Sequence, residues 1–269
     1  MNRSLAKKLQ MEIVDERSGV YSIVAEDGTE KALIRFDPNT QELSYANENS
    51  LTDFLNSNGH QFRKILHHKR KDTFRAGFRL AFSMIDGKDV AAYNDKRNLL
   101  VSDHGQVYVI APEKKRRLAE IYTDGSYCEK YEAGACSYLI KNLEGRYTER
   151  SFRTDSRSSA LIELEAVIAA LTDYPEDVRI ITDSQYVRKG IAEWIVHWKL
   201  NDWTTASGAK AKNISQWIHL DRLCRRRYVE FEWVKAHSGH FENDYCDIQA
   251  RGLAVGKSPR MLRKGFEDE

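Results

Sequence analysis

The chain has 269 residues, enough for one large domain or two smaller ones, and either arrangement can bury an apolar core. A hydrophobic content of 41% and a charged content of 30% are ordinary for a globular protein in water, and a net charge of +2 indicates no class of partner. No apolar run has the length of a membrane span or a signal peptide, so we expect a cytoplasmic protein without membrane contact. The four cysteines lack paired metal-ligand spacing and are expected to be free thiols.

Residues 1–111 are expected to form a small α+β domain. An Asp27-Gly28 turn lies between two β-branched runs, which is typical of a β-hairpin. The predicted elements are hairpin strands at 20–24 and 32–36, a third strand at 43–46, a short capped helix at 50–55 that ends near Gly59, and a strand at 106–110.

Between Arg63 and Arg79, basic residues are interleaved with phenylalanines. Such a mixture can follow a nucleic-acid backbone and stack on bases. It can equally form the two faces of an amphipathic helix, which the sequence favours. The N-terminal domain therefore has three candidate roles: nucleic-acid binding, contact with a protein partner, or self-association.

A charged stretch without apolar periodicity, residues 112–117, is the predicted linker to a second domain at 118–256. A basic and polar tail, 257–269, follows it. All five tryptophans lie in the second domain. Its predicted elements are strands at 119–123, 135–140, 146–152, 178–182 and 228–234, and helices over 161–171, 213–223 and the segment after Asn243.

Two aspartates are predicted at the ends of strands in this domain. Asp183 follows the strand at 178–182, with Ser184 as the cap of the next helix, and Asp124 ends the strand that begins at Ala119. In open α/β sheets, ligands and metals bind at the carboxyl ends of the strands. An isolated aspartate in such a place is more often a turn or capping residue.

Three further groups have ordinary explanations when each is taken alone. Glu163, with Glu165 as its rival, stands near the start of a helix, where a surface carboxylate favours the helix dipole. His237 lies in a loop, and Asn243 is predicted to cap a helix that carries Asp247. A loop histidine is more often a surface residue than a catalytic one.

Taken together, these segments resemble type 1 ribonuclease H of the bacterial ribonuclease HI family over residues 118–255. The resemblance rests on four separated segments in the family's order: Thr123-Asp124-Gly125-Ser126, Ile162-Glu163-Leu164, Thr182-Asp183-Ser184-Gln185-Tyr186-Val187, and the His237 loop with the Asp247 helix. It implies a ribonuclease H fold, an α/β fold in which helices flank a five-stranded mixed sheet. It also implies a carboxylate set of Asp124, Glu163, Asp183 and Asp247.

The activity that the resemblance implies is endonucleolytic hydrolysis of the RNA strand of RNA/DNA hybrids, leaving 3′-hydroxyl and 5′-phosphate ends. Two Mg²⁺ ions ~4 Å apart would serve this chemistry, with Mn²⁺ as the alternative ion. In this scheme Asp124 bridges both ions, Glu163 and Asp183 complete the leaving-group side, and Asp247 holds the nucleophile-side ion. His237 would move a proton near the attacking water or aid product release.

The resemblance also implies substrate contacts: Gln185 beside the scissile strand, Trp194 against DNA sugars, and Asn213 with Ser158 in a phosphate pocket. A helix-surface amide, a core tryptophan and helix caps are equally good explanations of these residues. The alternative function is a nucleic-acid-binding protein on the same scaffold with little or no turnover. A DNA-cutting relative of the fold is a weaker alternative.

This chain departs from the family pattern in three places. Residues 127–132 replace the glycine-rich loop that follows the first aspartate, and Ser159 and Ala160 replace amide side chains before Glu163. The segment 199–203, in the position of the family's basic protrusion, has one positive and one negative charge. Because phosphate attraction supplies much of nucleic-acid affinity, our hypothesis is that Arg63 to Arg79 replace the missing charge.

Overall fold

A computed structural model describes residues 5–67, 74–94, 96–97, 99–103, 106–107, 117–237 and 239–258. The chain forms two compact units. The N-terminal unit contains Met1–Tyr93 and Val196–Lys212, and the C-terminal unit contains Asn94–Ile195 and Asn213–Glu269. Within the described ranges, no helix is long and apolar enough to cross a membrane. The four cysteines are free, as predicted.

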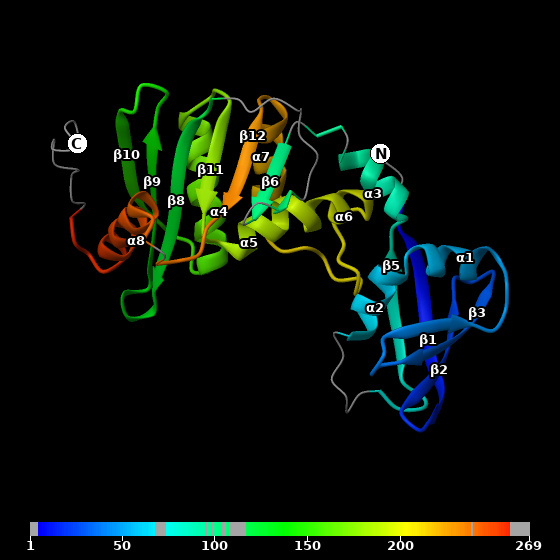
Figure 1. Cartoon of the computed structure of the whole chain (residues 1–269). Helices are drawn as coiled ribbons and strands as arrows, with labels where there is room; N and C mark the ends of the chain where they lie inside the picture. Colours follow the sequence, from blue (N-terminus) through cyan, green and yellow to red (C-terminus); the bar gives the residue numbers. More distant parts are fainter. Residues whose placement is uncertain are drawn as a thin grey trace. The chain divides into compact units, whose positions relative to one another are not determined.

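The N-terminal unit contains a five-stranded antiparallel sheet (Figure 1). The predicted hairpin and third strand are confirmed. The sequence analysis missed both the first strand and the last, although Leu9, Met11 and Ile13 alternate with polar residues as a half-buried strand requires. In spatial order the strands are β4 (Glu42–Tyr45), β3 (Lys31–Asp37), β2 (Val20–Glu26), β1 (Lys7–Arg17) and β5 (Arg79–Met84).

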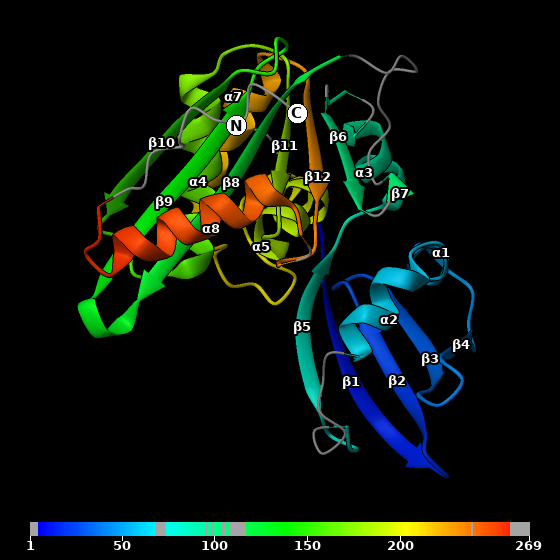
Figure 2. The same cartoon turned by 60° about the vertical axis from the view of Figure 1, so that its left-hand side comes forward.

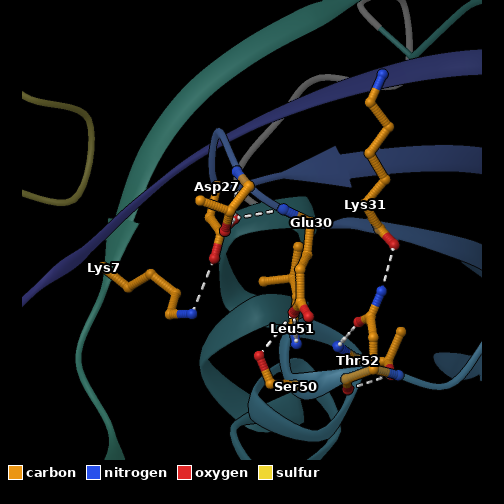
Figure 3. A network of polar contacts seen from close by, with 9 residues as sticks. Lys7, Asp27, Glu30, Lys31, Ser50, Leu51 and Thr52 are labelled. Atoms are coloured by element: carbon orange, nitrogen blue, oxygen red, sulfur yellow. Dashed lines mark hydrogen bonds and ion pairs between the residues drawn. The ribbon is translucent and has the colours of Figure 1, made fainter.

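Two helices, α1 (Ser50–Ser57) and α2 (Gly59–His67), pack on one face of this sheet, and their Leu55 and Phe62 side chains share its core. Helix α1 begins with reciprocal hydrogen bonds between Asn49 and Thr52. The Glu30 carboxylate also accepts hydrogen bonds from the Ser50 hydroxyl and the Leu51 amide at 2.6 and 2.9 Å, so it ties β3 to the start of α1 (Figure 3).

The basic and aromatic stretch from Arg63 to Arg79 does not form one helix. Helix α2 ends at His67, Arg79 begins β5, and residues 68–73, which include several of the basic side chains, lie outside the described residues. The helix interpretation therefore applies only to the first part of the stretch, where Phe62 and Leu66 are buried.

The C-terminal unit contains a mixed sheet in which the expected five strands are present. Two short strands, β6 (Leu99–Asp103) and β7 (Gln106–Val107), extend it to seven. Residues 99–103 and 106–107 therefore belong to this sheet, although they were predicted to lie in the first domain, because β6 pairs in parallel with a strand 130 residues later. The other strands, in spatial order, are β10 (Tyr147–Thr154), β9 (Ala133–Lys141), β8 (Ala119–Cys128), β11 (Val178–Thr182) and β12 (Val229–Trp233).

Helices cover both faces of this sheet (Figure 2). Helix α4 (Ser159–Asp173) packs Ile162 against Cys136 of β9, whereas α8 (Phe241–Ala254) packs Cys246 against Leu139 of the same strand. Positions 136 and 139 point to opposite faces of a strand, so the two helices lie on opposite sides. Helices α5 (Gln185–Lys189) and α7 (Ile214–Arg225) complete the unit, in which α7 contacts α4 and α5 contacts β12.

Candidate active site

Asp124 was predicted to end its strand, but it lies within strand β8. The strand continues to Cys128 because β9 keeps pairing with it, from Asp124 opposite Ser137 to Cys128 opposite Ala133. The Asp124 side chain is 5% exposed, and its Oδ1 atom accepts a hydrogen bond from the Gly125 amide at 2.7 Å.

Gly125 lets helix α4 approach β8 closely. A Cβ atom at this position would lie 2.7 Å from the Glu163 backbone nitrogen, closer than side-chain carbons come in real structures. The glycine therefore allows Glu163, in the first turns of α4, to reach Asp124. The Oε2 atom of Glu163 is inaccessible to solvent and has no hydrogen-bond partner among the residues that the structure describes.

Asp183 follows β11 directly, as predicted, and Ser184 caps α5 by accepting a hydrogen bond from the Val187 amide. The Trp233 indole donates to the Asp183 carbonyl at 2.8 Å, which fixes the backbone beyond the strand. The Asn243 amide donates to the Asp183 carboxylate at 3.2 Å. These contacts hold the carboxylate beside Asp124 and Glu163.

Asn243 does not cap helix α8, which is a correction to the sequence analysis. The helix begins at Phe241 with His240 as its N-cap. Asn243 therefore lies in the first turn and is buried, and its side chain reaches Asp183 from there. Since Asp247 is one turn further along, both side chains project from the same face of α8.

Oxygen atoms of Asp124, Glu163 and Asp183 lie within 4.8 Å of one another. Asp247 stands next to this group, with its side chain within hydrogen-bonding reach of Asp124. Its Oδ2 atom accepts a hydrogen bond from Arg251 and lies 3.8 Å from Nδ1 of His237. His237 is largely exposed and has a positive φ of 52°, and Ser238 lies outside the described residues.

The proximity of these acids disfavours their ionisation. Burial, followed by the charges of Asp183 and Asp247, raises the pKa of Asp124 to about 8. Burial and the charge of Asp124 raise the pKa of Glu163 well above its usual value. Burial also raises the pKa of Asp183, against the lowering effect of the hydrogen bond from Asn243.

Such a group must either share protons or hold a cation. Three carboxylates within 4.8 Å, with a buried oxygen to which no described residue hydrogen-bonds, supply the hard oxygen ligands that divalent cations such as Mg²⁺ prefer. The residues present therefore fit a metal site, and neutralisation by a cation would remove the cost of holding the carboxylates together.

The predicted substrate-contact residues divide into two pairs. Trp194 and Asn213 both meet Tyr186: the Trp194 ring lies edge-on to it with centroids 5.8 Å apart, and the Asn213 amide donates to its hydroxyl at 2.9 Å. Gln185 and Ser158 are exposed, and Ser158 is the N-cap of α4 without a side-chain capping bond. The hydrogen bonds described for Asn213 do not include one to Ser158.

Three residues organise the site through contacts that were not predicted from the sequence. Tyr186 accepts hydrogen bonds from Asn213 and from Trp217, the second at 3.1 Å. Asn243 orients Asp183, and Arg251 binds Asp247. The four-residue spacing of Asp247 and Arg251 was a readable signal for a pair on one helix face. No local signal could show the hydrogen-bond partners of Tyr186, because Asn213 and Trp217 lie at the start of helix α7.

Comparison with known proteins gives a consistent result. A sequence model of the family described as RNase H matches residues 116–254. Ribonuclease HI of Pasteurella multocida is 37% identical over 154 residues, 56% of this chain and 97% of that protein. Ribonuclease H of Serratia proteamaculans is 40% identical over 154 residues, 56% and 96% of the two chains. Among solved structures, LC9-RNase H1, described as a type 1 RNase H with the type 2 active-site motif, aligns at 24% identity with a TM-score of 0.46, covering 55% of this chain and 77% of that one.

Proposed function

Because the chain belongs to the ribonuclease H family, we propose that it cuts the RNA strand of RNA/DNA hybrids by metal-dependent hydrolysis. The observation that carries the proposal is the convergence of Asp124, Glu163 and Asp183, from three separate elements, on a region less than 5 Å across. Buried carboxylates that repel one another are unfavourable, as their raised pKa values indicate. Catalysis with bound metal ions explains such a cluster, whereas binding without turnover does not.

Asp124, Glu163, Asp183 and Asp247 would hold the divalent cations, which we take to be two Mg²⁺ ions. When bound, the ions supply an activated water and neutralise charge on the phosphate and the leaving 3′ oxygen. Asp124 is central to the cluster, in reach of both Asp183 and Asp247, and is the candidate bridging ligand. The products would carry 3′-hydroxyl and 5′-phosphate ends.

His237 has the role of moving a proton at the edge of the site. Its Nδ1 atom lies 3.8 Å from the Asp247 carboxylate, and its ring is exposed. An exposed imidazole can take a proton from the attacking water and release it to solvent, or aid release of the product.

Hybrid binding would use the exposed side chains around the carboxylates. Gln185 follows Asp183 by two residues and is free to meet the scissile strand, while Trp194 and Asn213 are held in place through Tyr186 for the DNA strand. Ser158, which makes no capping bond, offers a hydroxyl for a phosphate contact.

The proposal is tested by incubating the full chain in Mg²⁺ with an end-labelled RNA/DNA hybrid, duplex RNA and duplex DNA. We expect only the hybrid to be cut, and Asp183→Asn to lower the rate by at least about two orders of magnitude. Asp155→Asn is the matched control because Asp155 is an exposed aspartate in the loop before α4. Ligation of the products with and without phosphatase treatment reports the end chemistry.

Two results would contradict the proposal. Hybrid binding without any cutting would support the binding-protein alternative and direct attention to the altered loop at 127–132. Cutting that is unchanged in Asp183→Asn would show that a contaminant or another site is responsible.

A further inference from the structure

The N-terminal unit is assembled from two separate stretches of the chain. The chain leaves the C-terminal unit after Ile195, runs through Val196–Lys212, and returns at Asn213. We call Val196–Lys212 the excursion. It interrupts the family domain, yet it folds with strands formed by the first 93 residues.

Hydrogen bonds between described residues join the excursion to β5 and to the segment before β1. The Ser83 amide of β5 donates to the Ala206 carbonyl, and the Leu5 amide donates to the Leu200 carbonyl, both at 2.8 Å. The Asn201 side-chain amide donates to the Ser83 hydroxyl, also at 2.8 Å. Strand β5 is an edge of its sheet, so the excursion occupies a backbone donor that would otherwise face solvent.

Asn201 is the side chain through which the excursion is held. It is 7% exposed, and its amide also donates to the Thr204 carbonyl at 2.9 Å. Within this turn Asp202 and Trp203 have positive φ angles of 49° and 56°, which are strained for residues other than glycine. Strain of this kind persists only where surrounding contacts impose it, so the shape of the turn depends on Asn201.

Both ends of the excursion lie beside candidate substrate contacts. Trp194 immediately precedes Ile195, where the chain leaves the C-terminal unit, and Asn213 is the first residue after its return. Trp194 and Asn213 meet through Tyr186. Asn213 itself has a positive φ of 56°, so a change in the excursion would act directly on a strained junction.

The two arginines at the ends of the Arg63 to Arg79 stretch make contacts within the N-terminal unit. Arg63 donates to the Gln41 carbonyl at 2.9 Å, and Arg79 forms a 2.9 Å ion pair with Glu12. Both cations are thus engaged within their own unit. The contribution of this unit to the reaction is better explained by how it holds the excursion.

We propose that Asn201 is a positioning residue for substrate binding: by fixing the excursion to β5, it sets the placement of Trp194 and Asn213 and thereby the affinity for the hybrid. The proposal rests on the proposed function for the identity of the substrate. Asn201 is remote in sequence from all four carboxylates and has no contact with them among its described hydrogen bonds, so the chemical step is unaffected.

The first test asks whether the excursion holds the N-terminal strands without a covalent link. A specific protease site is inserted between Asn94 and Leu99 of the full chain, which leaves β6 on the larger fragment. After cleavage, both fragments should co-elute in size-exclusion chromatography. Asn201→Asp, which keeps the volume but loses both donated hydrogen bonds, should release the smaller fragment at concentrations where the parent retains it. Separation of the fragments in the parent would overturn the proposal.

The second test separates binding from chemistry in the uncut protein. Asn201→Asp should raise KM for the hybrid about five- to tenfold, the cost of losing buried hydrogen bonds, with kcat within about twofold. Ser83→Ala, which removes only the partner hydroxyl, should give a smaller change in the same direction. The matched control is Asn47→Asp, because the Asn47 amide makes a 2.7 Å bond to the Lys31 carbonyl within the N-terminal strands and should leave KM unchanged.

The outcomes distinguish this proposal from the proposed function. An unchanged KM in Asn201→Asp, or a fall in kcat without a rise in KM, would overturn the positioning role. Absence of hybrid cutting by the parent protein would refute the proposed function, and with it the substrate named here. The fragment-retention assay would still show whether the excursion binds the N-terminal strands.

Discussion

Removing the charge of Asp124 should stabilise the metal-free protein, and the gain should grow with pH. The folded chain holds a proton on Asp124 up to a pKa of about 8, whereas the unfolded chain releases it near the ordinary aspartate pKa of 3.8. Below pH 4 both states are protonated, and the group contributes its full share to stability. As the pH rises from 4 to 8, only the unfolded state loses the proton, so the free energy of unfolding falls.

The structure sets an upper bound on this effect. Each pH unit between the two pKa values corresponds to about 1.4 kcal/mol, so the whole interval corresponds to about 5 to 6 kcal/mol. Rearrangement of the neighbouring carboxylates and entry of water will reduce the figure. We expect Asp124→Asn to raise the free energy of unfolding by about 2 to 3 kcal/mol at pH 8.5 and by less than about 1 kcal/mol at pH 5.

The assay is equilibrium denaturation in urea with EDTA, at several pH values between 5 and 8.5, followed by circular dichroism and tryptophan fluorescence. Asp155→Asn, at an exposed position, should show no such pH-dependent gain. Addition of Mg²⁺ should cancel most of the gain at pH 8.5, because a ligand at 100 times its dissociation constant stabilises the parent by about 2.7 kcal/mol and the variant lacks a central ligand. A pH-independent gain, or none, would refute the idea that mutual repulsion strains this site.

Two further substitutions test the packing around Tyr186. A Cβ atom on Gly190 would lie 1.9 Å from the Trp217 ring, so Gly190→Ala should destabilise the protein by about 2 to 3 kcal/mol in urea denaturation, and an unchanged midpoint would contradict the close approach. Tyr186→Phe leaves the Asn213 amide and the Trp217 indole without their acceptor. It should lower stability by about 1 to 3 kcal/mol and raise KM for the hybrid, and a variant with parental KM would show that Asn213 does not depend on this contact.

The sequence predicted the central part of the C-terminal unit because its signals are local. The strand at 178–182 is a β-branched run, and Ser184 has the side chain of a helix cap, so the position of Asp183 at the strand end followed from neighbouring residues. The hairpin of the N-terminal unit was predictable for the same reason, since the Asp27-Gly28 turn specifies it.

Other features depend on partners distant in the sequence. The length of β8 is set by continued pairing with β9. Strand β6 belongs to the C-terminal sheet because it pairs in parallel with β12. The excursion lies within the family segment, and only the three-dimensional structure shows that it packs on β5. Asn243 also depends on a distant partner. Its sequence context is typical of a helix cap, but the helix begins two residues earlier and its amide donates a hydrogen bond to Asp183.

The two-stretch construction of the N-terminal unit has a consequence for synthesis on the ribosome. Its five strands can pair once Met84 has emerged, but the bond to the Ser83 amide needs Ala206. Since synthesis proceeds at roughly 5 to 20 residues per second, the edge of β5 stays unpaired for on the order of ten seconds before Ala206 emerges. Strand β6 waits longer still, for β12 at Val229–Trp233. During this interval the nascent protein exposes the unpaired edge of β5 and the unpaired strand β6, both of which can pair with another chain.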